Sequence, residues 1–199
     1  MLRPIILPLA LIALLQFPIP AFAQGTESQA DSIAEIALSD ETVQLRYIDQ
    51  GDYFGMDGSR MTGTFFLSEA RDVVLSAGVQ LPADIDLGPL SFTFGPQLYV
   101  ALLDEENSDV MSITIGTDVR LDIAPSMGLA VTGQAYYGPD VLTFGSADNL
   151  VDLSARLEVG LADQLILFGG MRWFEFDLTE GEGDRTLQDE VFVGFGYRF

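Results

Sequence analysis

Hydrophobic and polar residues alternate with a period of two along most of the chain. The C-terminal segment is the clearest case, because every second residue in it is large and apolar. These residues are Val191, Val193, Phe195, Tyr197 and Phe199. A period of two places alternate side chains on opposite faces of an extended backbone, so it predicts β-strands and not helices.

Nine segments follow this pattern and are predicted as strands. They are Glu41–Asp49, Arg60–Ser68, Asp72–Leu81, Leu90–Leu102, Met111–Leu121, Gly128–Tyr137, Asn149–Leu161, Leu165–Phe176 and Asp189–Phe199. Many have about ten residues or more, the length at which a tilted strand crosses a bilayer. Bacterial single-chain barrels have an even number of strands. We therefore add a short strand at Tyr53–Gly58 and predict ten strands, with eight as the alternative.

The face opposite the apolar one distinguishes a membrane barrel from a soluble sandwich. That face carries Gly, Ser, Thr, Gln and a few charges, whereas the wet face of a soluble sheet is rich in Lys, Glu and Thr. Small polar residues suit a barrel interior whose outer face meets lipid. Aromatic residues gather near strand ends, as in interfacial girdles. They are Phe92, Phe94, Tyr136, Tyr137, Trp173, Phe174, Tyr197 and Phe199. We predict an all-β, antiparallel, up-and-down transmembrane β-barrel.

The N-terminus has the features of a secretory signal peptide. Arg3 precedes an apolar run that is too short to span a bilayer, and Ala21-Phe22-Ala23 provides a small-x-small cleavage site after Ala23. Residues 24–40 form a polar N-terminal segment without clear alternation, expected to be disordered or a short helix over the periplasmic mouth. The barrel is expected over residues 41–199, in the outer membrane of a Gram-negative bacterium.

The charge and composition exclude several functions. The chain has 30 acidic and 9 basic residues, a net charge of −21, no His and no Cys, and every basic residue is Arg. Such a negative field repels nucleic acid. The missing residue types remove a Ser-His-Asp triad, thiol chemistry, disulfides and the usual zinc ligands. We expect no enzymatic activity, no cofactor and no metal centre.

Charged residues on the predicted inner face are the candidate lumen network. They are Arg46, Asp118, Arg120, Asp152, Arg156, Glu158, Arg172 and Arg198. Charged side chains inside a barrel are tolerated when they form ion pairs or are hydrated. In a barrel of this size the inward side chains nearly fill the interior. A structural ion-pair network is the first interpretation, and a conduction path is the second. Arg156 and Arg172 lie on neighbouring strands, so Glu158 or Asp152 is expected within ion-pair distance of one of them.

The last strand is the candidate assembly signal. Val193, Phe195, Tyr197 and the terminal Phe199 alternate as in strands that the barrel assembly machinery reads. An extended edge strand can pair with the edge of a receptor sheet, its main chain giving affinity and its alternate side chains selectivity.

Two acidic loops are candidate contacts for divalent cations. They contain Asp104-Glu105-Glu106 and the residues Asp177, Glu180, Glu182 and Asp184. Carboxylate oxygens are ligands for hard cations, but the spacing is not that of an EF-hand. We expect solvated loops that share divalent cations with lipopolysaccharide, alongside the lipid around the barrel.

Several motifs resemble the YfaZ family of outer-membrane proteins over most of Arg60–Phe199. Two of the motifs are the stretches 134–142 (Gln-Ala-Tyr-Tyr-Gly-Pro-Asp-Val-Leu) and 170–174 (Gly-Met-Arg-Trp-Phe). The last loop and strand match through 181–185 (Gly-Glu-Gly-Asp-Arg), followed by Asp189 and by Val193-Gly194. A turn in the first half of the chain matches through Leu81-Pro82 and Leu87-Gly88-Pro89-Leu90. The resemblance implies a small porin-like barrel without an established substrate. We expect a structural or surface-interaction envelope protein, with a narrow channel for small solutes as the alternative.

Overall fold

The computed structural model describes residues 31–85, 87–104, 108–179 and 183–199. The predicted signal peptide lies outside these residues. The described residues are almost entirely strands. Their bounds are β1 Asp31–Leu38, β2 Thr42–Tyr53, β3 Met56–Ser68, β4 Val73–Pro82, β5 Leu90–Leu103, β6 Ser108–Ala124, β7 Leu129–Gly138, β8 Thr143–Gly145, β9 Ala147–Gly160, β10 Leu165–Leu178 and β11 Asp184–Arg198. Two short 3-10 turns occur at Pro125–Met127 and Asp140–Leu142.

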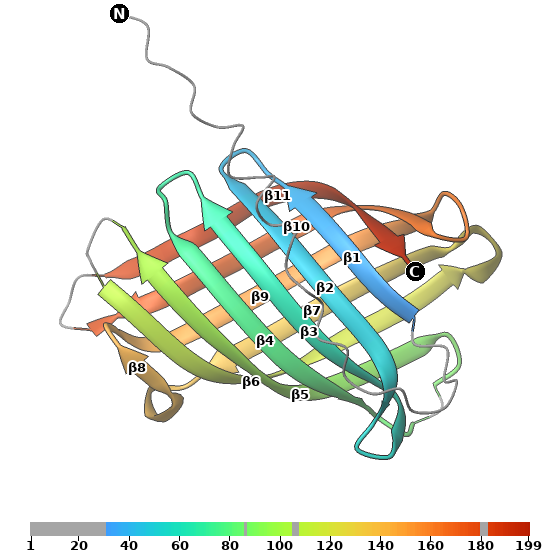
Figure 1. The fold of residues 1–199 in the computed structure, drawn as a ribbon, viewed down its shortest axis with the longest axis horizontal. Coiled ribbons are helices and arrows are strands. Elements are labelled where there is room, and N and C mark those ends of the chain that lie inside the picture. The colour runs from blue at the N-terminus through green and yellow to red at the C-terminus, as the bar shows by residue number, and fades with distance from the viewer. Residues whose placement is uncertain (1–30, 86, 105–107, 180–182) are drawn as a thin grey trace, which may run out of the picture.

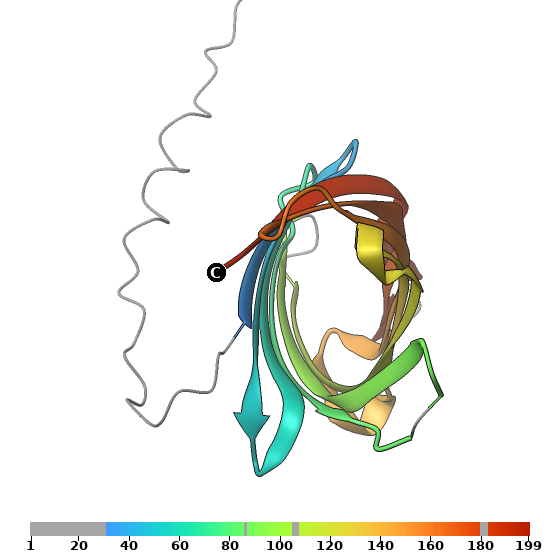
Figure 2. The same ribbon diagram turned by 90° about the vertical axis from the view of Figure 1, so that its right-hand side faces the viewer.

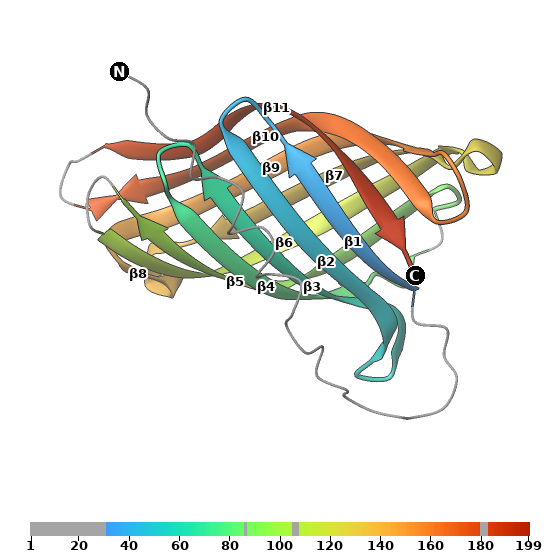
Figure 3. The same ribbon diagram turned by 45° about the horizontal axis from the view of Figure 1, so that its top comes forward.

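Ten of these strands form a closed antiparallel ring, which confirms the predicted fold and strand number. Neighbours in sequence pair with one another, β7 pairs with β9, and β1 pairs with β11 to close the ring. Figure 2 looks toward the end of the barrel that carries the C-terminus and shows the closed oval. β8 lies outside the ring, where it pairs with β6 beyond the end of β7 (Figures 1 and 3).

The identity of the tenth strand differs from the prediction. The proposed strand at Tyr53–Gly58 is wrong, because Tyr53 ends β2, Phe54 and Gly55 form the hairpin turn, and Met56 begins β3. Phe54 and Gly55 both have positive φ angles, 59° and 74°, as a tight two-residue turn requires. Tyr53 and Met56 pair directly across it.

The ring is completed by β1, inside the segment 24–40 for which we predicted no strand. That prediction is corrected for residues 31–38. The segment hides its alternation because both faces carry aliphatic residues: Ile33 and Ala37 line the lumen, whereas Ala34 and Ile36 are on the other face. Its pairing with both β2 and β11 makes it a strand in spite of this weak pattern.

The outer face of the barrel is apolar. Side chains such as Met171, Ile115 and Val193 are exposed to 61%, 65% and 65%, although the backbone around them is fully paired in the ring. A closed ring leaves no unpaired edge, and an apolar exterior is what lipid contact requires. No helix among the described residues has the length and hydropathy needed to span a membrane.

The predicted aromatic girdles are corrected at two positions. Trp173 and Tyr137 are exposed, but their neighbours Phe174 and Tyr136 are only 0% and 1% exposed and point into the barrel. Adjacent residues in a strand project to opposite faces, so both members of such a pair cannot meet lipid.

An apolar cluster fills part of the interior toward the end opposite the C-terminus. Twelve buried residues form one cluster there: Phe66, Val74, Tyr99, Ala101, Leu103, Val110, Ala147, Leu150, Phe174, Phe176, Leu178 and Leu187. We call it the lumen cluster. The ring centroid of Phe174 on β10 lies 5.7 Å from those of Phe66 on β3 and Tyr99 on β5. None of these strands is adjacent to β10 in the ring, so the contacts cross the lumen.

Candidate functional site: the charged lumen

The remaining part of the lumen is charged, and all eight residues of the predicted network face it. Seven of the eight line one cavity of about 240 Å³, and Asp152 lies behind its wall, bonded to Arg172. The cavity extends from Arg198, near the C-terminal end of the barrel, to Arg172 below the lumen cluster. None of the twelve residues of the lumen cluster lines it.

Arg156 is the centre of an ion-pair chain that crosses the cavity. Its guanidinium donates two hydrogen bonds of 2.9 Å to the carboxylate of Glu35 on β1. It also lies 2.7 Å from Glu158, which in turn accepts a hydrogen bond from Arg120. Arg120 pairs with Asp122 at 2.9 Å. Such bidentate, charge-assisted contacts fix both partners in one geometry.

Arg172 and Asp152 form the most buried ion pair, with side chains only 8% and 1% exposed. Two guanidinium nitrogens each donate to a different carboxylate oxygen at 2.8 Å. Asp152 also accepts a hydrogen bond of 2.8 Å from Tyr99. The guanidinium lies 4.4 Å from the ring centroid of Phe174, within cation–π range. This pair forms the boundary between the charged cavity and the lumen cluster.

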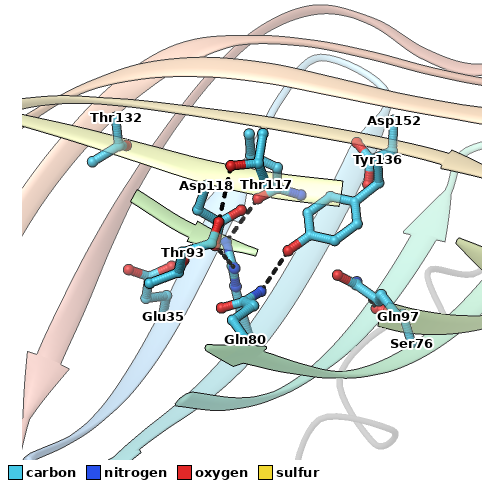
Figure 4. Close-up of polar contacts among 12 residues, drawn as sticks. Glu35, Ser76, Gln80, Thr93, Gln97, Thr117, Asp118, Thr132, Tyr136 and Asp152 are labelled. Atoms are coloured by element: carbon cyan, nitrogen blue, oxygen red, sulfur yellow. Dashed lines mark hydrogen bonds and ion pairs between the residues drawn. The ribbon is translucent and has the colours of Figure 1, made fainter. Parts of the chain in front are cut away.

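Arg46 and Asp118 are more loosely joined, at 3.9 Å. Arg46 also donates to Gln134 at 3.1 Å. Close by, Gln80 donates to the hydroxyl of Tyr136 at 2.7 Å, and Figure 4 shows the Tyr136 ring reaching toward Gln80 from the strand wall. Gly116 gives this ring its room, because a Cβ there would lie 2.2 Å from a carbon of Tyr136.

Two arginines of the cavity have no partner. Arg60 and Arg198 make no hydrogen bond or ion pair through their side chains with any other described residue, and the Nε atom of each is buried. Arg198 belongs to the predicted network, but Arg60 does not. Arg60 lies within electrostatic range of Arg46, Arg120, Asp118 and Glu158.

Sequence reasoning missed Glu35, Arg60 and Tyr99 as lumen residues. Arg60 shares strand parity with Thr62 and Phe66, so alternation alone could have found it. Tyr99 could have been found from β5 in the same way. Glu35 carried no signal, because its strand shows no clear alternation.

The four residues of the candidate assembly signal project outward from β11. Val193, Phe195, Tyr197 and Phe199 are 65%, 53%, 46% and 55% exposed. The same strand closes the ring: Phe199 donates its amide proton to Ser32 O at 2.9 Å and accepts one from Ser32 N at 3.1 Å.

The acidic loops lie at the end opposite the C-terminus. Glu105, Glu106, Glu180 and Glu182 fall outside the described residues. Of the others, Asp177 accepts a hydrogen bond of 2.8 Å from Asn149. The described residues contain no group of three acids arranged to hold a metal ion. A separate ion pair at this end joins Arg185 of β11 to Asp72 beside β4 at 3.0 Å.

A closed ring with an apolar exterior and a charged interior defines an outer-membrane β-barrel. The chain belongs to the YfaZ family, since the family model described as "YfaZ precursor" matches residues 27–199. It is thus a small porin-like barrel of the outer membrane.

Two solved structures are similar to the chain. The KdgM porin, solved in complex with disordered oligogalacturonate, is 8% identical with a TM-score of 0.46; the match covers 85% of this chain and 99% of that one. The outer-membrane channel DcaP of Acinetobacter baumannii is 11% identical with a TM-score of 0.39, covering 87% of this chain and 55% of that one. No curated protein sequence matches the chain.

Proposed function

We propose that the protein is a non-enzymatic envelope barrel with a closed lumen, and not an open pore. The observation that carries the proposal is the contact of Phe174 with Phe66 and Tyr99 across the lumen. Beneath it, the Arg172–Asp152 pair adds a buried polar layer. A water-filled path would need this section to be open. The absence of His and Cys from the sequence supports a role without catalysis.

We also propose that the C-terminus faces the periplasm and that the acidic loops face outward. In this orientation the loops meet lipopolysaccharide and can share divalent cations with its phosphates. Val193, Phe195 and Tyr197 of β11, together with the terminal Phe199, would engage the assembly machinery from the periplasmic side. The seven paired residues of the predicted network, which are all of its members except Arg198, would then act as structural ion pairs. A narrow channel for small solutes is the alternative, supported by the cavity on the C-terminal side.

Conductance in planar bilayers tests the closed lumen. We expect the wild-type barrel to show no steady ion current. The double variant Phe66→Ala/Phe174→Ala removes two rings that meet across the lumen, and it should conduct. Each truncation also removes buried apolar contacts, at a cost of about 3–5 kcal/mol, so folding of this variant must be checked on gels.

The matched control replaces two exposed aromatic residues outside the lumen, Phe94 of β5 and Phe144 of β8. Phe94 and Phe144 are 50% and 48% exposed, so Phe94→Ala/Phe144→Ala should remain non-conducting. Steady unitary conductance of the wild-type protein would overturn the closed lumen and establish the channel alternative, whatever the variants do.

A further inference from the structure

The cavity has a charge opposite to that of the whole protein. The chain has 30 acidic and 9 basic residues, yet six of the nine arginines line this one cavity. These are Arg46, Arg60, Arg120, Arg156, Arg172 and Arg198. Only three acidic residues line it: Glu35, Asp118 and Glu158.

The six arginines exceed the acidic residues around them by one, because Asp122 and Asp152 pair with Arg120 and Arg172 in addition to the three lining acids. Each of the three lining acids already has an arginine partner, and Arg172 is paired with Asp152. Arg60 and Arg198 remain, with buried Nε atoms and no partner among the described residues. A purely structural network would be expected to match its charges, because an unpaired charge in a confined space is unfavourable.

The two free guanidinium groups have different positions. Arg198 is the last residue of β11 and lies near the end of the barrel at which the chain terminates. Arg60 projects from β3, and it lies within electrostatic range of the acids Asp118 and Glu158 as well as of Arg46 and Arg120. Both line the same cavity. Guanidinium groups form planar, paired hydrogen bonds with carboxylate and phosphate groups, which a compact halide cannot exploit in the same way.

We infer that the cavity is a binding site for a small polyvalent oxyanion, entered from the C-terminal side of the barrel and held by Arg60 and Arg198. Its ligand carries two or more carboxylate or phosphate groups and is small, since the cavity measures about 240 Å³. The paired residues Glu35, Arg156, Glu158 and Arg120 form the fixed wall of this site. The inference does not depend on whether the lumen conducts.

Thermal unfolding and calorimetric titration of the full mature barrel in detergent test the site. The probes are citrate for carboxylate groups and pyrophosphate for phosphate groups, with sodium chloride at equal ionic strength as the reference. At least one polyanion should bind saturably and raise the Tm, because a ligand that binds only the folded state stabilises it. The probe that binds more tightly identifies the preferred group.

Three glutamine variants locate the binding. Arg60→Gln and Arg198→Gln break no ion pair, and each should weaken binding about tenfold or more, as expected for the loss of a charge-assisted contact. Arg71→Gln makes the same change of charge at a side chain that is 83% exposed outside the cavity, and it should bind like wild type. If Arg60→Gln does not insert into the membrane, Arg60→Lys takes its place. Lysine keeps the positive charge but lacks the planar, paired donors of the guanidinium group, so this variant should bind with intermediate affinity.

Three results would overturn the inference. One is the absence of saturable binding of both polyanions, and another is an equal rise in Tm with chloride alone. The third is unchanged affinity in Arg60→Gln and Arg198→Gln, or equal weakening in Arg71→Gln. Conductance plays no part in these readouts, so the closed lumen and the anion site can fail separately.

Discussion

Replacing Arg172 by alanine should lower the free energy of unfolding by about 3–5 kcal/mol, because it leaves the buried Asp152 carboxylate without its counter-ion. The Asp152 side chain is only 1% exposed, and among the described residues the neutral Tyr99 hydroxyl would be its one remaining hydrogen-bond donor. The substitution also removes the cation–π contact with Phe174. Urea unfolding of the refolded barrel, followed by tryptophan fluorescence and by heat-modifiable migration on gels, measures the change.

Two further variants separate charge from packing at this pair. Arg172→Met/Asp152→Leu removes both charges together and should recover most of the stability, because no unpaired buried charge remains. Arg71→Ala serves as the control, since its ion pair with Asp104 spans 3.9 Å between exposed side chains and should contribute less than about 1 kcal/mol. If Arg172→Ala were as stable as wild type, the Arg172–Asp152 pair would be hydrated, and the lumen would be open to water at the position of this pair.

Deleting Phe199 should strongly reduce insertion into the outer membrane while secretion continues. The deletion has two effects on β11. It removes the aromatic side chain of the assembly signal, and it removes two backbone hydrogen bonds with Ser32 at the junction that closes the ring. The Phe199 ring also packs against Tyr47, with ring centroids 6.4 Å apart. Outer-membrane fractionation and heat-modifiability of the variant measure insertion.

Phe199→Ala distinguishes the two effects, because it keeps the backbone pair with Ser32 and loses only the ring. An insertion defect as large as that of the deletion would assign the signal to the side chain, whereas normal insertion would assign the defect to closure of the ring. Phe94→Ala, at an outward aromatic residue of β5 that is 50% exposed, controls for the general loss of lipid contact. Normal insertion of the deletion itself would show that Phe199 has neither role.

The sequence by itself determined the strands that alternate strongly and the face that each presents. The segment Asn149–Leu161 shows why: Leu153 and Leu157 are exposed on the outer face, whereas Asp152 and Glu158 are buried. Alternation is a local property of an extended backbone, so it can be read without knowledge of any partner strand. The even strand number then followed from the closure of membrane barrels.

Tertiary structure decided the strand at Asp31–Leu38 and the turn at Phe54. The first alternates weakly and is held as a strand by pairing with β2 and β11 on either side. The second depends on two consecutive residues with positive φ angles, which the hairpin imposes on Phe54 as well as on Gly55. Neither condition can be read from local hydropathy.

The partners inside the lumen were also decided only by the closed ring. The sequence placed Arg172 and Asp152 on inward faces of neighbouring strands, but their contact depends on the register that sets Arg172 opposite Ser154. The pairing of Arg156 with Glu35 joins residues 121 positions apart, on strands that are not adjacent. Parity tells which side chains point inward. The closure of the ring and the relative shift of its strands determine which of these side chains meet. They also leave Arg60 and Arg198 without a hydrogen-bond or ion-pair partner among the residues that the structure describes.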